Sequence, residues 1–542
     1  MGAWSFVAAA LLALAPCAFA VSTDTKTITG WDLIEPSPDL RWVSCFQKYK
    51  CARLQVPLDY GNPSRGSTAI AFVKLPARNA TSNTRDVLIN PGGPGNSGVA
   101  NLIGSRFPFT DVIPAEYNVI GFDPRGIGHS GPEVDCWPGH PEIRAQFEKL
   151  FSAETSNASS TSLTNQFYAA DFFGKACTPS VGGTNGSAAF ISTPAVARDM
   201  LTFIKAEQRR RRRLDHEVKL NYYGLSYGTV LGTTFAHLFP DNVGRMVLDG
   251  VADAEDTYNG GWRHNLYDAD EAIHHFYQSC YDGGPQNCSF WGPSVGNIER
   301  RFRQLLDHLK YNPIPVSSSP YCSIPLLATY SVVKQIALQA IYLPVTRFPI
   351  LADVLAGLEK GNATAYMVAA TSFISPNPCN NGTAGTTSDV AVLIRCVDAA
   401  GGTVRLNTLQ KYRDYVDFMQ DQSKILGEAW PAYASDVSCR SFDVRVPETG
   451  KLQGSILDPR NTATPILFVT SAVDPVTPKR GAYKMSSVFE NSTVLIQNSV
   501  GHGAIGSLSS CVVRSVQAYY SHGQLPPPDT VCEPDVVSFQ AV

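Results

Sequence analysis

The sequence predicts an α/β fold with a mostly parallel central sheet, and three observations support this. Short apolar runs recur along the chain, and each stops at a loop rich in Gly, Pro or Asp, as buried parallel strands do. Segments with helical spacing lie between these runs. Of the 542 residues, 44% are hydrophobic and 17% are charged, which suits a large core and argues against disorder. The net charge of −3 argues against a dedicated nucleic-acid binder.

The first twenty residues predict a secretory signal. Their apolar stretch ends in Ala18-Phe19-Ala20, the small-residue pattern of a cleavage site, so we expect cleavage near Ala20 and a secreted, extracellular product. The alternative is an uncleaved membrane anchor, because no Lys or Arg precedes the stretch. The stretch is short for a span, and no later run reaches about 18 apolar residues, so no stable membrane insertion is expected.

The cysteines and glycosylation sequons favour the same compartment. One of the 13 cysteines, Cys17, lies in the predicted signal, and the remaining even number suits up to six disulfides. Cys45 with Cys51, and Cys280 with Cys288, are close enough to be local pairs. Seven N-x-S/T sequons predict a glycoprotein; their asparagines are Asn79, Asn157, Asn185, Asn287, Asn362, Asn381 and Asn491.

Two kinds of strand follow in chain order. Residues 51–58 and 67–75 alternate apolar and polar side chains, as half-buried antiparallel strands do. Six short apolar runs then predict the buried parallel strands: residues 87–89, 117–122, 218–223, 245–248, 466–469 and 494–496. Ligands of such sheets bind beyond the carboxyl ends of the strands, where the Gly-rich loops fall.

Helices are predicted between these strands. Thr193 and Pro194 form a good helix start, and further helices are expected over Tyr227–Phe239 and Ser510–Tyr520. Residues 255–445 break the alternation with helical patterns at 272–276, 298–309 and 332–341. We therefore expect four parts, which are a signal peptide at 1–20, a first core part at 21–254, an inserted helical lid at 255–445 and a C-terminal core part at 446–542.

Five consecutive arginines, Arg209 to Arg213, precede the third parallel strand. A nucleic-acid or processing site is one interpretation. The surrounding chain is not basic, so we expect a solvated loop instead.

The strongest chemical motif is Gly224-Leu225-Ser226-Tyr227-Gly228, which matches G-x-S-x-G between a predicted strand and a predicted helix. Small residues on both sides of the serine permit a sharp turn that exposes its hydroxyl at the edge of the sheet. Ser226 is therefore the predicted nucleophile, and a purely structural turn is the alternative.

A serine hydroxyl needs a base, and the base needs an orienting acid. His502 lies between two glycines just after the last apolar run, and it is preferred over His522 and His129 because of its position in the chain. Asp474 follows the preceding run and is the predicted acid, with Asp249 as the alternative.

The oxyanion formed by attack on a carbonyl needs preorganised N–H donors. One is expected from the backbone of Tyr227, and the other from the loop Asn90-Pro91-Gly92-Gly93-Pro94-Gly95, where Gly93 is preferred to Gly92. No Lys-Ser/Thr follows this loop, so it is a poor phosphate-binding loop. No HExxH or other metal motif is present, and no cofactor or metal is expected.

These motifs resemble those of the α/β-hydrolase superfamily, and more narrowly the secreted tripeptidyl aminopeptidase branch of the prolyl aminopeptidase family of serine peptidases. The resemblance rests on NPGGPGNSG, DPRGIGHSG (residues 123–131), GLSYG and residues 464–532, and it covers most of the chain from about residue 40. It implies an α/β-hydrolase fold with a lid. Asn90 stands where many relatives have His, which argues against a strict proline preference.

The resemblance and the residues together predict a secreted serine aminopeptidase that releases short N-terminal peptides through an acyl-enzyme on Ser226. An esterase, thioesterase or lactone hydrolase acting on a small molecule is the second hypothesis, and a catalytically inactive binding protein is the third. The expected partner is a peptide or small ester substrate.

An aminopeptidase must also hold the substrate ammonium. Five acidic residues cluster at the entrance to the predicted lid, and they are Glu255, Asp256, Asp268, Asp270 and Glu271. Solvated surface carboxylates are the commoner explanation for such a cluster.

Overall fold

The structure is a computed structural model that describes residues 28–540 except 82, 106, 213–217, 317–324 and 374–386. The predicted signal peptide, the sequon at Asn381, and Cys17, Cys322 and Cys379 lie outside the described residues.

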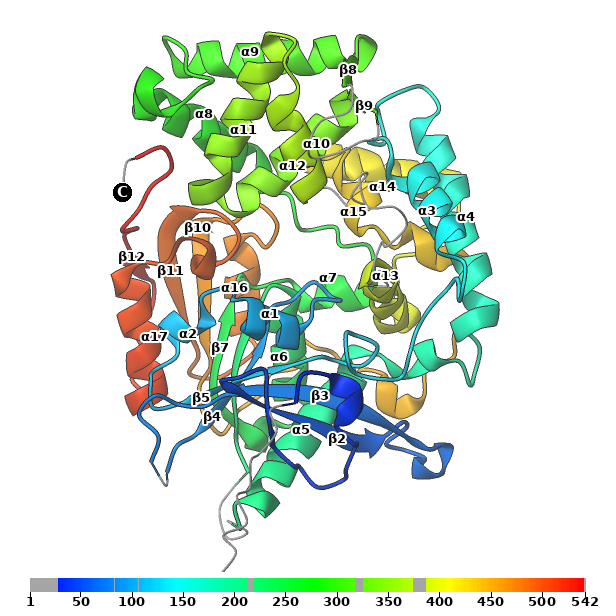
Figure 1. Cartoon of the computed structure of the whole chain (residues 1–542), viewed down its shortest axis with the longest axis vertical. Coiled ribbons are helices and arrows are strands. Elements are labelled where there is room, and N and C mark those ends of the chain that lie inside the picture. The colour runs from blue at the N-terminus through cyan, green and yellow to red at the C-terminus, as the bar shows by residue number, and fades with distance from the viewer. Residues whose placement is uncertain are drawn as a thin grey trace, which may run out of the picture.

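The described residues form a ten-stranded sheet in the order β1-β2-β3-β5-β4-β6-β7-β10-β11-β12 (Figure 1). The pairs β1–β2, β2–β3 and β3–β5 are antiparallel, and the other pairings in this sheet are parallel. The bounds are β1 Val43–Cys45, β2 Tyr49–Pro57, β3 Ser67–Leu75, β4 Asp86–Asn90, β5 Asn118–Phe122, β6 Leu220–Leu225, β7 Val243–Asp249, β10 Leu467–Val473, β11 Thr493–Val500 and β12 Thr530–Cys532. The predicted α/β class is confirmed, and the short strands β1 and β12 are additions at the two edges.

Both faces of the sheet are covered, which explains why the parallel strands are apolar at successive positions. On one face, Leu88 packs in a cluster with Phe203 and Leu231 of helices α5 and α6. On the other, Val87 packs in a cluster with Val516 of α17. The bounds are α1 Gly98–Gly104, α2 Phe109–Val112, α5 Thr193–Arg210, α6 Tyr227–Leu238, α16 Lys479–Ser486 and α17 Ser510–His522. Helices α5, α6 and α17 begin at the predicted residues.

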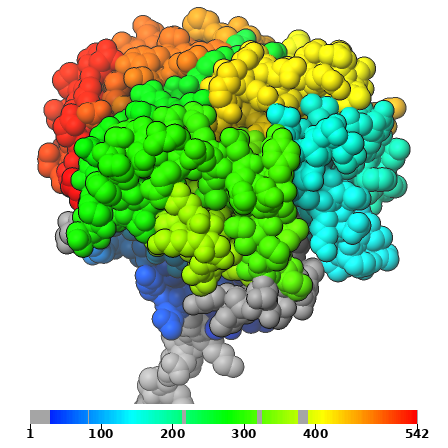
Figure 2. Space-filling view, turned by 90° about the horizontal axis from the view of Figure 1, so that it is seen from above, coloured from blue at the N-terminus to red at the C-terminus, as the bar shows by residue number. Residues whose placement is uncertain are grey.

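Between β7 and β10 the chain forms a set of helices and one short hairpin, named here the insertion (residues 254–450). Its elements are α7 Ala254–Asn259, α8 Ala269–Asn287, α9 Val295–Tyr311, β8 Ile314–Val316, β9 Leu326–Ala328, α10 Tyr330–Tyr342, α11 Pro344–Glu359, α12 Thr364–Phe373, α13 Thr387–Asp398, α14 Leu409–Gln422 and α15 Trp430–Ala434. The insertion lies beyond one end of the strands in Figure 1, and it forms much of the face seen in Figure 2. Its description as a separate lid domain stays a prediction.

Two helices from the first core part join the insertion, which the sequence analysis did not foresee. They are α3 (Pro141–Ser152) and α4 (Ser162–Val181), and they lie beside α13 to α15 in Figure 1. Arg144 of α3 pairs with Asp389 of α13 at 3.2 Å, and Arg440 pairs with Asp171 of α4 at 2.8 Å. The helices of residues 141–181 and of the insertion together form one layer, named here the covering layer. It is therefore built from two separate stretches of chain.

Five disulfides lie within the described residues, and they include both local pairs that the sequence suggested. They are Cys45–Cys51, Cys136–Cys177, Cys280–Cys288, Cys396–Cys439 and Cys511–Cys532. The six described sequon asparagines are all exposed, and their glycosylation stays a prediction. Within the described residues, no helix has both the length and the apolar character needed to cross a membrane.

The expectation of a solvated arginine loop holds only in part, because Arg209, Arg210 and Arg212 are exposed but the run is not a simple loop. Arg209 and Arg210 form the last turn of α5. Arg211, whose side chain is only 19% exposed, pairs with Glu207 at 2.8 Å and with Asp86 at 2.6 Å. Asp86 belongs to β4 and is distant in the sequence. An interpretation based only on the sequence around the arginines therefore could not predict this tertiary ion-pair network.

The disulfides give a first testable prediction, based on the length of the loop that each closes. Cys396–Cys439 closes 43 residues and Cys280–Cys288 only 8. From the loss of chain entropy in the unfolded state, the first disulfide should stabilise the fold by about 4 kcal/mol and the second by about 2.5 kcal/mol. Replacing both cysteines of a pair by serine should lower the unfolding free energy more for 396/439 than for 280/288, measured by denaturant unfolding. An equal or larger loss for the short loop would contradict this.

Candidate active site

Ser226 lies at the sharp turn between β6 and α6. Its backbone has φ 59° and ψ −125°, a strained conformation for a residue with a side chain. The turn is held by main-chain bonds, since Ser226 N–H donates to Asp249 O at 3.0 Å and Thr229 N–H donates to Ser226 O at 2.7 Å. The side chain of Ser226 is half-buried. The turn is therefore set by its backbone surroundings, which leaves the hydroxyl available for chemistry.

The two glycines of the motif are required by close backbone packing. A Cβ on Gly224 would lie 2.3 Å from the carbonyl oxygen of Gly228, and a Cβ on Gly228 would lie 2.7 Å from that of Asn90. Real Cβ atoms do not approach backbone so closely, so any larger residue would force the turn apart. The G-x-S-x-G spacing is thus a steric consequence of how β4, β6 and α6 meet.

His502 and Asp474 lie together on the loops after β11 and β10. His502 Nδ1 is 3.2 Å from Asp474 Oδ1 and 3.3 Å from Oδ2. Asp474 is fully buried, and His502 is 7% exposed. A Cβ on Gly503 would lie 2.9 Å from Leu225 Cδ1, so the histidine loop packs against the strand that carries Ser226. The three predicted residues follow the carboxyl ends of the parallel strands β6, β10 and β11.

Asp474 is held by donors from both loops. Its Oδ1 accepts from the N–H groups of Val476 (3.1 Å) and Thr477 (2.8 Å), and its Oδ2 accepts from Thr477 Oγ1 and Gly503 N, both at 2.8 Å. An ionised carboxylate only accepts hydrogen bonds, so the Nδ1 of His502 must carry the proton that faces it. This tautomer leaves Nε2 unprotonated.

Thr477 is a site residue that the sequence analysis missed. Its hydroxyl donates to Asp474 Oδ2, and its oxygen lies 3.1 Å from His502 Nδ1. The hydroxyl therefore supports the same imidazole nitrogen that Asp474 orients. The sequence signal for Thr477 was its position three residues after the acid. A threonine at that spacing does not by itself indicate a role in the site.

The competing candidates have other partners. Asp249 accepts from Ala504 N at 2.7 Å, from Ile505 N at 3.0 Å and from the Tyr223 hydroxyl at 2.9 Å, and burial raises its pKa to about 6. It thereby fixes the chain just after His502 and makes no hydrogen bond to the imidazole. His129 stacks on Trp31 with ring centroids 4.9 Å apart, and His522 is exposed at the end of α17.

The Gly-rich loop after β4 lies against the turn that carries Ser226. A Cβ on Gly92 would lie 2.8 Å from Ser226 Cβ and 3.1 Å from Tyr227 N. The Gly92 N–H is already engaged, because it donates to Asn90 Oδ1 at 2.9 Å. This leaves the Gly93 amide as the candidate donor from this loop. Tyr227 begins α6, where the first N–H groups lack partners inside the helix.

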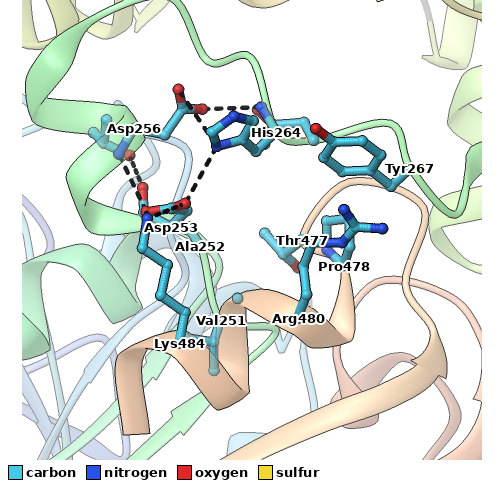
Figure 3. A pocket seen from close by; sticks show the side chains of 13 residues that line it. Val251, Ala252, Asp253, Asp256, His264, Tyr267, Thr477, Pro478, Arg480 and Lys484 are labelled. Atoms are coloured by element: carbon cyan, nitrogen blue, oxygen red, sulfur yellow. Dashed lines mark hydrogen bonds and ion pairs between the residues drawn. The ribbon is translucent and has the colours of Figure 1, made fainter. Parts of the chain in front are cut away.

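A pocket of about 320 Å³ lies beside the acid loop (Figure 3). Thr477 lines it, together with charged residues from the loops around α7 and from α16. Lys484 pairs with Asp253 at 2.8 Å, and His264 Nδ1 lies 3.4 Å from the same carboxylate. Arg480 covers the Tyr267 ring at 3.6 Å. Among the described residues, no group of three His, Cys, Asp or Glu side chains is arranged to hold a metal ion.

The five acidic residues at the entrance to the insertion do not act as one cluster. Three of them have partners within the protein: Glu255 pairs with Lys484 at 2.7 Å, Asp256 accepts from His264 N at 3.0 Å, and Asp270 accepts from Lys424 N at 2.9 Å. Asp268 is different. Its carboxylate, like that of the exposed Glu271, accepts no hydrogen bond from a described residue, but Asp268 is half-buried, and burial together with the negative charge of Asp474 raises its pKa to about 6.

Comparison with known proteins matches two family profiles, "alpha/beta hydrolase fold" over residues 87–288 and "TAP-like protein" over residues 428–532. The chain has the α/β-hydrolase fold and is a serine hydrolase, and the matches support the TAP-like branch. The two matched regions contain Ser226 and both Asp474 and His502. The predicted family and fold are therefore confirmed, while the roles of the individual residues stay proposals.

Three curated relatives cover nearly the whole chain. A tripeptidyl aminopeptidase of Streptomyces lividans is 26% identical over 90% of this chain and 84% of its own. The serine protease Hip1 of Mycobacterium tuberculosis is 26% identical over 89% of this chain and 87% of its own. A carboxylesterase B of Mycobacterium tuberculosis is 25% identical over 92% of this chain and 91% of its own. A solved serine hydrolase from Cycloclasticus zankles covers 87% of this chain and 98% of its own at 11% identity, with a TM-score of only 0.34.

The position of Thr477 gives a second testable prediction. Thr477→Val removes the hydroxyl donor to Asp474 and the contact with His502 while it keeps the volume. A hydrogen bond to a charged group contributes about 1.5–3 kcal/mol, so kcat should fall by roughly 10- to 100-fold with little change in KM. Thr477→Ser should keep most of the activity. Wild-type kcat in Thr477→Val, measured with an aryl ester, would contradict the assigned role.

Proposed function

We propose that this protein is a secreted serine aminopeptidase that releases short peptides from the N-terminus of its substrates. The observation that carries the proposal is the buried Asp474–His502 pair, 3.2 Å apart, whose histidine loop packs against β6, the strand that leads into Ser226. Relatives named tripeptidyl aminopeptidase and serine protease, matched over most of both chains, support the peptidase assignment. The exposed sequon asparagines and the disulfides are compatible with a secreted glycoprotein.

In the proposed reaction, Ser226 is the nucleophile and His502 the base. Asp474 and Thr477 hold Nδ1, so Nε2 takes the hydroxyl proton as Ser226 Oγ attacks the carbonyl carbon. The imidazolium that forms is stabilised by Asp474, and it returns the proton to the leaving amine. Water activated by the same histidine then releases the acyl group from Ser226.

The negative charge on the carbonyl oxygen needs donors that are already in place. We assign this role to the backbone N–H groups of Tyr227 and Gly93. The Gly92 amide already donates to Asn90, and so the side chain of Asn90 keeps the loop in position without itself facing the substrate. Removing one such donor typically costs on the order of 10²- to 10³-fold in kcat.

The substrate ammonium is assigned to Asp268. Its carboxylate is the half-buried acid near Asp474 that accepts no hydrogen bond from a described residue, whereas Glu255, Asp256 and Asp270 already have partners. A carboxylate close to the catalytic residues favours substrates that present a free N-terminus, which is what distinguishes an aminopeptidase from an endopeptidase.

The nucleophile assignment is tested by Ser226→Ala. We expect loss of turnover by at least about 10³-fold, because the acyl-enzyme cannot form. A fluorophosphonate probe should label the wild-type protein and not the variant, as seen by mass spectrometry. Full activity in Ser226→Ala would refute the mechanism, and an unlabelled wild-type protein would favour a catalytically inactive binding function.

An esterase acting on a small molecule is the second candidate function. It is favoured by the relative named carboxylesterase B, which matches the chain about as extensively as the peptidases do. A tripeptide anilide and a simple aryl ester should be assayed side by side. Ester turnover without any peptide cleavage would support the esterase and overturn the aminopeptidase proposal.

The role of Asp268 gives a pH-dependent prediction. Its pKa is raised to about 6, so the carboxylate is ionised above that pH and neutral below it. Ammonium binding should therefore weaken, and KM for a tripeptide anilide should rise, as the pH falls through about 6. Asp268→Asn should raise KM by roughly tenfold at pH 8 and remove this pH dependence.

The matched control is the aryl ester, which carries no ammonium. Its KM and kcat should change little in Asp268→Asn. A KM change shared by both substrates would mean that the substitution disturbs the nearby Asp474 instead of an ammonium site.

A further inference from the structure

The loop that carries His502 is bonded to the insertion as well as to the sheet. The His502 N–H donates to the carbonyl oxygen of Tyr342, the last residue of α10, at 2.9 Å. The Tyr342 ring meets the His502 ring edge to face, with centroids 5.1 Å apart and an angle of 74°. Both the backbone and the side chain of the proposed base therefore contact one residue of the insertion.

The turn between α10 and α11 fits closely against this loop. A Cβ on Gly501 would lie 2.9 Å from Pro344 Cδ, and a Cβ on Gly506 would lie 3.2 Å from Leu343 Cδ2. On its other side the loop is bonded to the sheet, since Gly501 N–H donates to Val473 O at 3.0 Å. The histidine loop is thus clamped between β10 and the insertion.

A second contact joins the insertion to the nucleophile turn. The Tyr227 hydroxyl is hydrogen-bonded to Thr193 Oγ1. Thr193 in turn donates twice to Asp398, from its backbone N–H at 2.8 Å and from its hydroxyl at 2.5 Å. Asp398 is the last residue of α13, and the disulfide at Cys396 ties that helix to the rest of the insertion. The side chain of the residue that supplies one oxyanion donor is therefore fixed by an acid from the insertion.

We propose that the insertion is a working part of the catalytic apparatus, in which Tyr342 positions His502 and Asp398, through Thr193, positions Tyr227. This inference rests on the proposed roles of His502 and Tyr227 and specifies what holds them in place. The alternative is an insertion that only covers the site and selects substrates. The two differ in kinetics, because a cover alters substrate binding, whereas a positioning contact alters the chemical step.

A positioning contact can affect the rate because proton transfer tolerates only small displacements of the reacting groups. A displacement of about 1 Å in a catalytic group can cost on the order of 100-fold in rate. Loops at strand ends are intrinsically more mobile than the strands that carry them. On the sheet side the histidine loop is bonded to Val473, Asp474 and Asp249, and the contacts with the insertion restrict it from a second side.

The base side is tested with Tyr342→Leu, which removes the ring and keeps an apolar side chain. We expect kcat for an aryl ester, and the rate of Ser226 labelling by a fluorophosphonate, to fall by about tenfold, with KM changed less than about threefold. Tyr342→Phe should restore both rates, because the ring and not the hydroxyl contacts His502.

The matched control is Tyr366→Leu, another tyrosine of the insertion. Tyr366 is 1% exposed and its hydroxyl donates to Leu327 O at 2.8 Å, within the insertion. Tyr366→Leu should lower the thermal stability at least as much as Tyr342→Leu does, while its kcat stays within about twofold of wild type. Equal kinetic losses in the two variants would overturn the proposal in favour of a general loss of stability.

The nucleophile side is tested with Thr193→Val, which breaks the bridge between Tyr227 and Asp398 but preserves shape. The expected result is a fall in kcat of about three- to tenfold without a matching rise in KM, and rescue by Thr193→Ser. Thr233→Val is the control, because its hydroxyl bonds only Val230 O in the same helix, and it should leave kcat unchanged.

The outcomes separate this inference from the proposed function. If Tyr342→Leu and Thr193→Val raise KM while kcat and the labelling rate stay at wild-type values, the insertion only covers the site and the inference is wrong. If the wild-type protein is neither labelled at Ser226 nor active on ester or peptide, the proposed function itself fails. An ester assay keeps the test valid even if peptides prove not to be the substrate.

Discussion

The arrangement of the site depends on one buried carboxylate. A carboxylate removed from water is costly unless donors surround it, and Asp474 is fully buried. Its donors come from its own loop, through Val476 and Thr477, and from the histidine loop, through Gly503. Satisfying Asp474 therefore requires the loops after β10 and β11 to stay together, and the imidazole of His502 is oriented as a consequence.

Sequence patterns located the sheet and the catalytic candidates because those signals are local. A buried parallel strand is apolar at successive positions, and Val87 and Leu88 show why, since they pack into different clusters on the two faces. The glycines around Ser226 mark a turn whose steric limits reach only a few residues. The edge strands of the sheet were harder to predict, because β1 and β12 have three residues each, too few to show a hydrophobic pattern.

The signals that were missed depend on distant partners. Arg211 belongs to an ion-pair network only because β4 brings Asp86 beside it, and no charge pattern around Arg211 reveals that. Helices α3 and α4 have ordinary helical sequences, and their membership of the covering layer follows from contacts such as Arg144 with Asp389. Tyr342 contacts His502 partly through its carbonyl oxygen, a group that every residue has, so its identity carries no sequence signal.

The clamp on His502 also constrains how substrate reaches Ser226. If the insertion swung away from the sheet as a rigid body, the bond from His502 N–H to Tyr342 O would break or pull the histidine loop with it. The Asp398–Thr193 bonds would break on the nucleophile side as well. An enzyme whose insertion positions its base and its oxyanion donor must keep that insertion closed during turnover. Substrates that reach Ser226 while the insertion is closed must be thin enough to pass beside its helices, and a peptide N-terminus meets that requirement better than the middle of a folded chain.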